Sequence, residues 1–201
     1  MLKNYLLVAV RNLKRNKVFS LINILGLALG MACSLLIILW VQDEKNMDSF
    51  HTNKSRLYNI YENQYYDGKI QSGYYTPGLL AREMKKKIPE IEKSVDYSIY
   101  PDKLTFQAGD KIIKEEGTYS SEDFFSMFSF QLLLGKPNNA LNDPSSIPIS
   151  RKMAGHFFGS PEAAIGKTIR CENKRDFKVT GVFEDPPQHS ILKFDFVANW
   201  Y

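Results

Sequence analysis

The sequence predicts an α+β protein with three parts: an N-terminal amphipathic helix, one transmembrane helix and a mixed-sheet domain. First, residues 18–41 form an apolar run without a charged side chain. Second, strand-like and helix-like segments alternate after that run, with hairpin turns between them. Third, 13 Phe, 11 Tyr and 2 Trp among 201 residues provide enough apolar surface for a core. The expected boundaries are 1–17, 18–41 and 42–201.

The apolar run 18–41 is long enough to cross a bilayer. At about 1.5 Å per residue it spans roughly 36 Å, whereas the hydrocarbon core measures about 30 Å. Trp40 lies near one end, where an aromatic ring suits the interface. A cleaved signal peptide has a shorter apolar region of about 7–15 residues, and the run continues well past Cys33. We therefore expect a retained anchor rather than a signal or lipoprotein leader.

Charge sets the expected orientation. All five basic residues of segment 1–41 precede the span, and no acid accompanies them: Lys3, Arg11, Lys14, Arg15 and Lys17. The opposite flank, 43–48, holds three acids and one lysine. The positive-inside rule therefore predicts that the N-terminus lies in the cytoplasm and the main domain on the other side of the membrane. Residues 42–201 contain the other 21 basic residues and all 22 acidic residues. This near balance of charge argues against a general nucleic-acid-binding surface.

Small and polar residues predict a packing face on the transmembrane helix. Asn23, Gly26, Gly30 and Ser34 recur at spacings of three and four, so they share one side. Small residues let a second helix approach closely, and an amide can bond across such a contact. The alternative is that glycine is simply common in membrane helices.

The segment before the span combines apolar and basic positions. Leu2, Tyr5, Leu6, Ala9 and Leu13 form a helical stripe with basic residues between them. This pattern predicts a short helix on the inner membrane surface, with an N-terminal extension of the transmembrane helix as the alternative.

The soluble part predicts strands and helices in alternation. Thr76-Pro77 is expected to open a helix with its apolar stripe at Leu79, Leu80, Met84 and Ile88, and further helices are expected from 121 and over 151–158. Hairpin turns are expected at Asp67-Gly68 and Gly109-Asp110. Strands are expected over 56–62, 95–100, 104–108, 111–114, 147–150, 168–171, 177–183 and 194–197.

No residue pattern indicates catalysis. The phosphate-binding Gly-x-x-x-x-Gly-Lys-Ser/Thr motif and the hydrolase and zinc motifs are all absent. His51, His156 and His189 are far apart and favour structural roles over metal binding. Cys33 and Cys171 should lie too far apart for a disulfide, and only Cys171 is expected to react with an impermeant thiol reagent from outside. We expect neither an enzyme nor a bound cofactor.

Several short motifs follow one another along the chain. They are Arg11-Asn12-Leu13, Asp48-Ser49-Phe50-His51, Arg56-Leu57-Tyr58, Pro89-Glu90-Ile91-Glu92, the segments 124–130 and 133–137, 154–159 with 165–168, Val179-Thr180-Gly181-Val182-Phe183 and Asp185-Pro186-Pro187-Gln188-His189-Ser190. This ordered set resembles the N-terminal part of MacB-like and FtsX-like ABC-transporter permeases of the bacterial inner membrane, over essentially the whole chain. The Asp-x-Phe-His variant is most similar to versions common in Bacteroidetes-type bacteria.

The resemblance implies a MacB-like periplasmic core domain that moves when a partner ATPase hydrolyses ATP in the cytoplasm. It implies an ABC ATPase, a second permease copy and membrane lipid as partners, and allows a periplasmic protein or lipoprotein as a fourth. Asp48, Phe50 and His51 form the membrane-exit junction, where Asp48 and His51 are expected to pin the domain to the end of the span. The alternative function is a single-span binding module without energy coupling.

One feature departs from that family. Its permeases have at least four spans, whereas this sequence predicts one. We therefore expect a fragment or a truncated product, with domain 42–201 incomplete at its C-terminus and the ATPase-binding parts missing.

Overall fold

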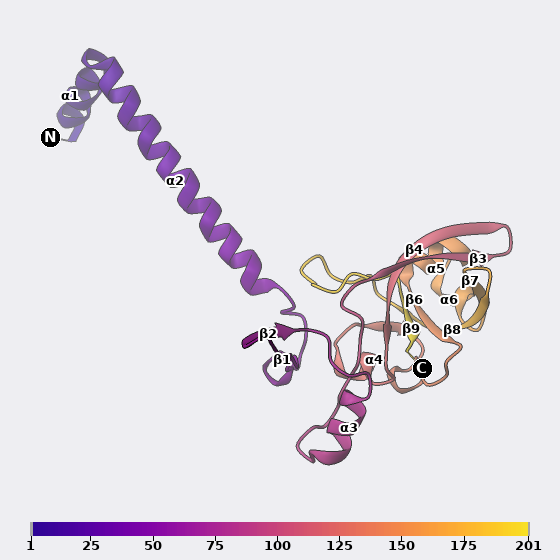
Figure 1. Ribbon diagram of the computed structural model, residues 1–201. Coiled ribbons are helices and arrows are strands. Elements are labelled where there is room, and N and C mark those ends of the chain that lie inside the picture. Colours follow the sequence, from indigo (N-terminus) through magenta and orange to yellow (C-terminus); the bar gives the residue numbers. More distant parts are fainter. Residues whose placement is uncertain (1, 201) are drawn as a thin grey trace. The chain divides into compact units, whose positions relative to one another are not determined.

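The computed structural model describes residues 2–200 and separates between Met47 and Asp48 into a helical unit and a sheet unit (Figure 1). The helical unit holds α1 (Leu2–Arg15) and α2 (Lys17–Asn46). A break at Asn16, with ψ of 57°, separates the two helices, so α1 is not a continuation of the transmembrane helix. Helix α2 extends the apolar run into Gln42–Asn46 because no proline or glycine interrupts it there.

Helix α2 is long and apolar enough to cross a membrane, with a mean hydropathy of 2.6 in its most apolar window. None of its side chains is buried. A helix with exposed apolar side chains on every side is stable in an apolar solvent, and a bilayer supplies one.

The sheet unit contains nine strands and four α-helices among the described residues. Its helices are α3 (Leu80–Lys87), α4 (Phe124–Met127), α5 (Arg151–Phe158) and α6 (Pro161–Ala164), with single 3₁₀ turns at Lys54–Arg56 and Pro137–Asn139. Its strands are β1 (Glu62–Tyr66), β2 (Lys69–Gly73), β3 (Asp102–Ala108), β4 (Lys111–Ser120), β5 (Leu132–Leu134), β6 (Ser146–Ser150), β7 (Thr168–Cys171), β8 (Arg175–Phe183) and β9 (Phe196–Asn199).

The main sheet closes on itself. Its order is β5-β8-β6-β9-β4-β3-β7, and β7 also pairs with β8, so six strands complete a ring. The pairs β4–β9 and β6–β8 are parallel and the others are antiparallel. The mixed sheet and the α+β class are as predicted. Strands β1 and β2 form a separate hairpin.

Two apolar clusters hold the sheet unit. The first joins the inner face of the ring to α5, through Phe106, Ile149, Met153, Val179 and Phe196 among others. The second gathers Phe124, Phe125, Phe130, Phe183 and Phe194 beside α4. The phenylalanine-rich segment 124–130 is thus core.

Several expected elements differ in detail. Residues 57–61 form no strand, because their alternating pattern finds no partner strand to pair with. Segment 95–100 contributes only one bridge, between Tyr97 and Ser120. Helix α3 begins at Leu80 rather than Pro77, because the Leu80 N–H closes a turn onto the Pro77 carbonyl at 2.9 Å. Within it Ala81 is buried, whereas Leu79 is exposed.

Candidate functional site: the membrane-exit junction

Asp48 is the first residue of the sheet unit, two positions after α2 ends. Its backbone takes a left-handed conformation, with φ of 53°, which Asp tolerates better than most residues. The Asp48 N–H donates to the His189 carbonyl at 2.8 Å, and Asp48 Oδ1 accepts the Ile191 N–H at 3.0 Å. Asp48 therefore clamps the loop between β8 and β9.

That loop is held by its own polar contacts. The Ser190 N–H donates to the Pro187 carbonyl at 3.0 Å, and Ser190 Oγ donates to the Leu192 carbonyl at 3.0 Å. Lys193 Nζ donates to the Gln188 carbonyl at 2.9 Å. The clamp from Asp48 thus engages a constrained loop.

His51 lies three residues further on and is only 7% exposed. Its Nδ1 accepts the Ser129 N–H at 3.2 Å, which places the ring proton of the neutral form on Nε2. The Phe50 ring centroid lies 4.0 Å from the His51 ring, and those of Phe128 and Phe130 lie 5.4 Å away. An aromatic cage therefore surrounds one backbone hydrogen bond.

Burial lowers the pKa of His51, because the cage removes water from the charged ring. The Asp48 carboxylate raises this pKa but has less effect than burial, and Lys54 adds a still smaller lowering. Protonation of Nδ1 would also replace the accepted hydrogen bond with two facing donors. The geometry therefore favours the neutral ring.

Thr52 and Phe50 extend the junction into the domain. The Thr52 N–H donates to Ser129 Oγ at 3.0 Å, and the two hydroxyl oxygens are 3.0 Å apart. Phe50 packs against the second core cluster, with its ring 5.3 Å from that of Phe130. Phe130 contacts Phe194 at 4.8 Å, and Phe194 contacts Phe183 on β8 at 5.1 Å. A continuous chain of rings therefore leads from the junction to the closed sheet.

The structure brings together residues that the sequence keeps far apart. Asp48, Phe50 and His51 were predicted as junction residues, but their partners Ser129 and Ile191 were not singled out. Both partners lie within or beside motifs that carried the family resemblance, at 124–130 and 185–190. Those motifs and Asp48-Ser49-Phe50-His51 belong to the same ordered set in the sequence. That shared membership was the signal that could have linked Ser129 and Ile191 to the junction.

The other predicted site residues lie on α2. A shallow groove lined by Gly26, Gly30 and Ser34 runs along one side, and Asn23 is not among its lining residues. No atom outside the helix backbone lies within 4 Å of a Cβ built on either glycine. Ser34 Oγ donates to the Gly30 carbonyl at 2.9 Å, so its proton is used within the helix. Pairing of this face with a second helix stays a prediction.

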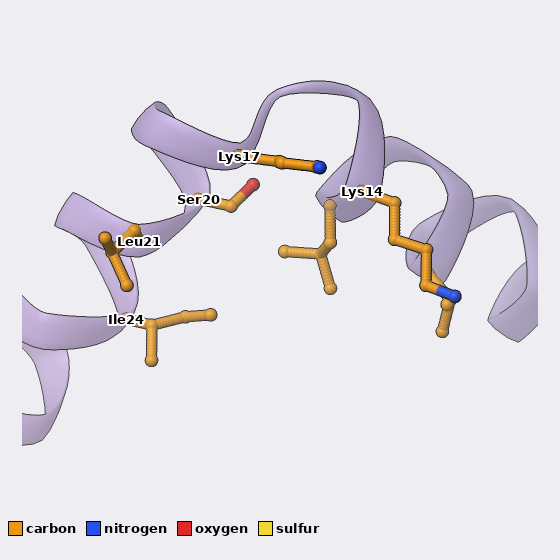
Figure 2. Close-up of a pocket in the computed structure, with 7 residues that line it drawn as sticks. Lys14, Lys17, Ser20, Leu21 and Ile24 are labelled. Carbon is orange, nitrogen blue, oxygen red and sulfur yellow. The ribbon is translucent and has the colours of Figure 1, made fainter.

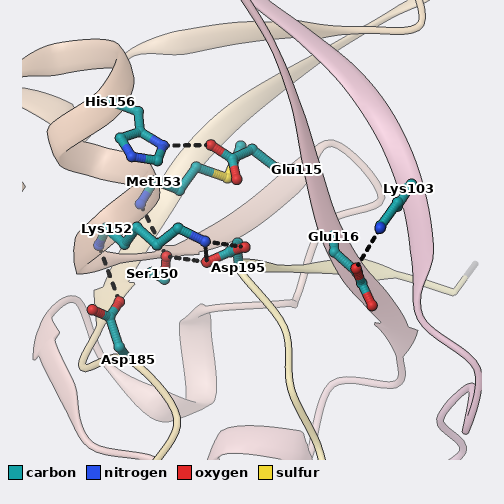
Figure 3. Close-up of polar contacts among 9 residues, drawn as sticks. All are labelled: Lys103, Glu115, Glu116, Ser150, Lys152, Met153, His156, Asp185 and Asp195. Atoms are coloured by element: carbon teal, nitrogen blue, oxygen red, sulfur yellow. Dashed lines mark hydrogen bonds and ion pairs between the residues drawn. The ribbon is translucent and has the colours of Figure 1, made fainter.

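A second set of polar contacts braces α5 (Figure 3). Lys152 Nζ lies 3.0 and 2.9 Å from the two carboxylate oxygens of Asp195, and this hydrogen bonding raises the pKa of Lys152. Ser150 Oγ caps α5 by accepting the Met153 N–H at 3.0 Å. His156 Nδ1 lies 2.7 Å from Oε1 of Glu115, whose side chain is 4% exposed. These contacts fasten α5 to β4 and to the start of β9.

Within residues 2–200, no three His, Cys, Asp or Glu side chains gather as metal ligands would. Cys171 is buried, and burial raises the pKa of its thiol to about 11. It is therefore a poor target for the thiol reagent that the sequence suggested, because the thiolate is the reactive form.

A candidate membrane anchor followed directly by an α+β domain defines the class of a membrane-anchored protein with one folded domain. The chain belongs to the family of the MacB-like periplasmic core domain, whose family model matches residues 20–199. A search of curated proteins gives no significant match.

One solved structure has the same fold, and two others are more distantly similar. A domain of a protein described as a candidate permease from Porphyromonas gingivalis superposes with a TM-score of 0.54 at 23% identity, covering 65% of this chain and 55% of that one. The periplasmic region of MacB from Actinobacillus actinomycetemcomitans gives 0.42 at 18% identity, covering 60% and 53%. The extracellular domain of the noncanonic ABC-type transporter YknZ from Gram-positive bacteria gives 0.43 at 17%, covering 57% and 58%. The chain thus spans a little over half of each solved domain.

Proposed function

We propose that this chain is a permease component of an ABC transporter, which couples ATP hydrolysis by a partner ATPase to movement of the sheet unit. Its N-terminus would lie in the cytoplasm and its sheet unit in the periplasm, with the anchor in the inner membrane. Membership of the MacB-like family supports the transporter class. The uneven charge across the anchor supports the orientation.

The observation that carries the coupling proposal is the membrane-exit junction. Asp48 bonds to the 187–191 loop and His51 bonds to Ser129, both within five residues of the end of α2. Only Met47 lies between the end of α2 and Asp48 in the sequence, so no long linker separates the helix from these contacts. Coupling of distant sites through rigid elements favours such a short connection.

We further propose that the role is mechanical rather than catalytic, and that two copies act together beside the ATPase. The groove at Gly26, Gly30 and Ser34 supports a helix–helix contact between copies. A periplasmic protein or lipoprotein would be the cargo or partner on the outer side. A binding module without energy coupling is the competing function.

Two measurements on the full chain in its native membranes separate these functions. Affinity purification with mild detergent should recover an ABC ATPase, identified by mass spectrometry. Spin labels at Asp110→Cys, on the exposed β3–β4 turn, should then report an inter-copy distance that changes when ATP is added. A Cys33→Ala background removes the second exposed thiol. An unchanged distance, or no ATPase in the purified complex, would favour the binding module.

A further inference from the structure

Exposed tyrosines are concentrated in the segment that holds the β1–β2 hairpin. Six of the eleven tyrosines lie within residues 58–75, and all six are more than half exposed. Strands β1 and β2 pair with each other and not with the main sheet. Within residues 2–200 neither face of the hairpin is buried. A two-stranded hairpin is only marginally stable in water, so a surface that covers one face would stabilise it.

The hairpin has one aromatic face and one polar face. Strand alternation and the β1–β2 register place three opposed pairs on the aromatic face: Tyr61 with Tyr74, Asn63 with Ser72, and Tyr65 with Ile70. The opposite face carries four polar side chains and one tyrosine: Glu62, Gln64, Lys69, Gln71 and Tyr66. The hairpin is therefore amphipathic.

Most polar groups of the aromatic face are paired with one another. The Ser72 hydroxyl donates to Asn63 Oδ1 at 2.7 Å. The phenol groups of Tyr61 and Tyr74 share a hydrogen bond, and their ring centroids are 4.8 Å apart. A polar group that already has a partner costs less free energy to remove from water. The aromatic face is therefore suited to an environment that is drier than bulk water.

The open end of the hairpin, at Tyr61, lies in the neighbourhood of the membrane-exit junction. The Tyr97 ring lies 5.9 Å from Phe128, and the Phe128 ring lies 5.4 Å from His51. Burial is the main cause that raises the pKa of Tyr97, and the charges of Asp48 and Tyr61 raise it further. Tyr97 is thus near both the junction and the hairpin.

Chain length limits the distance between the junction and the lipid. Helix α2 continues for five residues after Val41, where the apolar run ends, and only Met47 then precedes Asp48. Asp48 is therefore at most about 15 Å from the end of that run, and the head-group layer is itself roughly 5–8 Å thick. Each five-residue strand of the hairpin is about 17 Å long. The hairpin is long enough to reach the lipid from the junction.

The lipid contact predicted for α1 has a different chemistry. Around the turn between α1 and α2, apolar Leu21 and Ile24 are exposed together with basic Lys14 and Lys17 (Figure 2). Basic and apolar side chains together favour anionic lipid. Residues 58–75 instead hold two acids and one lysine. Their aromatic side chains suit the membrane interface without a contribution from positive charge.

We propose that the aromatic face of the β1–β2 hairpin lies among the lipid head groups of the leaflet from which the C-terminal end of α2 emerges. The polar face stays in water. The hairpin gives the sheet unit a second contact with the membrane besides the chain connection at Asp48. The proposal is independent of transport and depends only on α2 being a membrane span.

The test places single tryptophans on the two faces of the hairpin. The full chain is reconstituted into phosphatidylcholine vesicles that contain a phospholipid with a spin-labelled head group, and quenching of tryptophan fluorescence is measured. Trp40→Phe/Trp200→Phe removes the native tryptophans. A chain with Trp200→Phe alone keeps Trp40 as a reporter of membrane insertion.

Neighbouring register positions provide matched variants. Tyr65→Trp and Ile70→Trp report the aromatic face, and Gln64→Trp and Gln71→Trp report the polar face one residue away. Quenching by lipid should be at least about twofold stronger on the aromatic face, because an amphipathic element buries its apolar face about 5–10 Å into the head-group boundary. Acrylamide, a quencher in water, should give the reverse order. Adding phosphatidylglycerol should leave the difference unchanged.

Four results would overturn the proposal. Equal lipid quenching on the two faces would remove the preference for the aromatic face. Exposure of all four positions to acrylamide, without lipid quenching, would place the whole hairpin in water. Protection of Tyr65→Trp and Ile70→Trp from both quenchers would mean that a protein surface, such as a second copy, covers the face. Absence of lipid quenching at Trp40 would overturn the membrane span on which the proposal depends.

Discussion

At the scale of single residues, Asp48 does two things that few side chains combine. It tolerates a left-handed backbone, and its carboxylate accepts the Ile191 N–H. Asp48→Ala removes both, so we expect a loss of about 2 kcal/mol in the free energy of unfolding of the sheet unit. Asp48→Asn keeps an acceptor and a residue suited to that backbone, so it should lose under about 1 kcal/mol. Urea unfolding of the full chain in micelles, followed by tyrosine fluorescence, measures both. Losses under about 1 kcal/mol in both variants would show that the clamp contributes little.

His51 should make the sheet unit sensitive to acid. Its pKa lies below the ordinary 6.5, so between the folded-state pKa and 6.5 the unfolded chain binds more protons. Stability is therefore fully present above pH 6.5 and decreases as the pH falls through that window. His51→Asn retains an acceptor for Ser129 but does not titrate, so its stability should change less with pH.

An NMR titration of the His51 ring in the full chain checks this directly. A pKa at or above 6.5 would contradict the prediction. Parallel pH dependence of unfolding in the native chain and His51→Asn would assign the acid sensitivity to other groups.

At the scale of elements, two glycines offer a matched comparison. Gly117 on β4 faces Phe196 on β9, and a Cβ there would overlap the Phe196 carbonyl and ring. Gly155 lies on the exposed side of α5 with open space around it. Gly117→Ala should destabilise the sheet unit by about 1–3 kcal/mol through overpacking, whereas Gly155→Ala should stabilise it by about 0.5–1 kcal/mol. Thermal unfolding distinguishes them, and a tolerated Gly117→Ala would refute the close β4–β9 contact.

Elements also explain why the sequence predicted hairpins better than isolated strands. The turns Gly109-Asp110 and Asp67-Gly68 sit between segments that are adjacent in sequence, and both hairpins form. Segments 56–62 and 95–100 show comparable alternation, but residues 57–61 form no strand and 95–100 contributes only the Tyr97–Ser120 bridge. A strand needs a partner strand, and an alternating pattern does not show whether another segment pairs with it in the fold.

At the scale of the whole molecule, the orientation needs a better probe than Cys171. Its buried thiol, with a pKa of about 11, should stay unmodified in the native protein on either side of the membrane. In a Cys33→Ala background, Asp110→Cys places an exposed thiol on the β3–β4 turn. An impermeant maleimide added outside the inner membrane should modify Asp110→Cys and leave Cys171 unmodified. Modification only after the inner membrane is broken would reverse the orientation.

Association of two copies through α2 has a similarly direct test. Gly26→Ile/Gly30→Ile fills the groove, so we expect about fivefold weaker helix association, or roughly 1 kcal/mol. Ala28→Ile/Ala32→Ile places the same isoleucine side chains on the opposite side of the helix and should have little effect. Energy transfer between labelled full-length chains in bilayers measures the difference. Equal effects from the two pairs would remove the groove from the interface.

The sequence by itself determined the features that depend on local composition. An uncharged run produces a membrane-length helix wherever the rest of the chain lies, and its flanking charges predict a direction for it. Turn residues between neighbouring segments specify hairpins, and Ser150 before α5 with Gly159 after it marks a helix start and stop. These signals lie within a few residues of what they specify.

Only the tertiary structure decided how distant segments meet. Closure of the sheet depends on β7 pairing with both β3 and β8. The partners of the junction lie 78 residues from His51, at Ser129, and 143 residues from Asp48, at Ile191. Burial likewise turned Cys171 from an expected reactive thiol into an inert one. Such outcomes depend on which surfaces pack together, and this depends on the whole chain rather than on any local pattern.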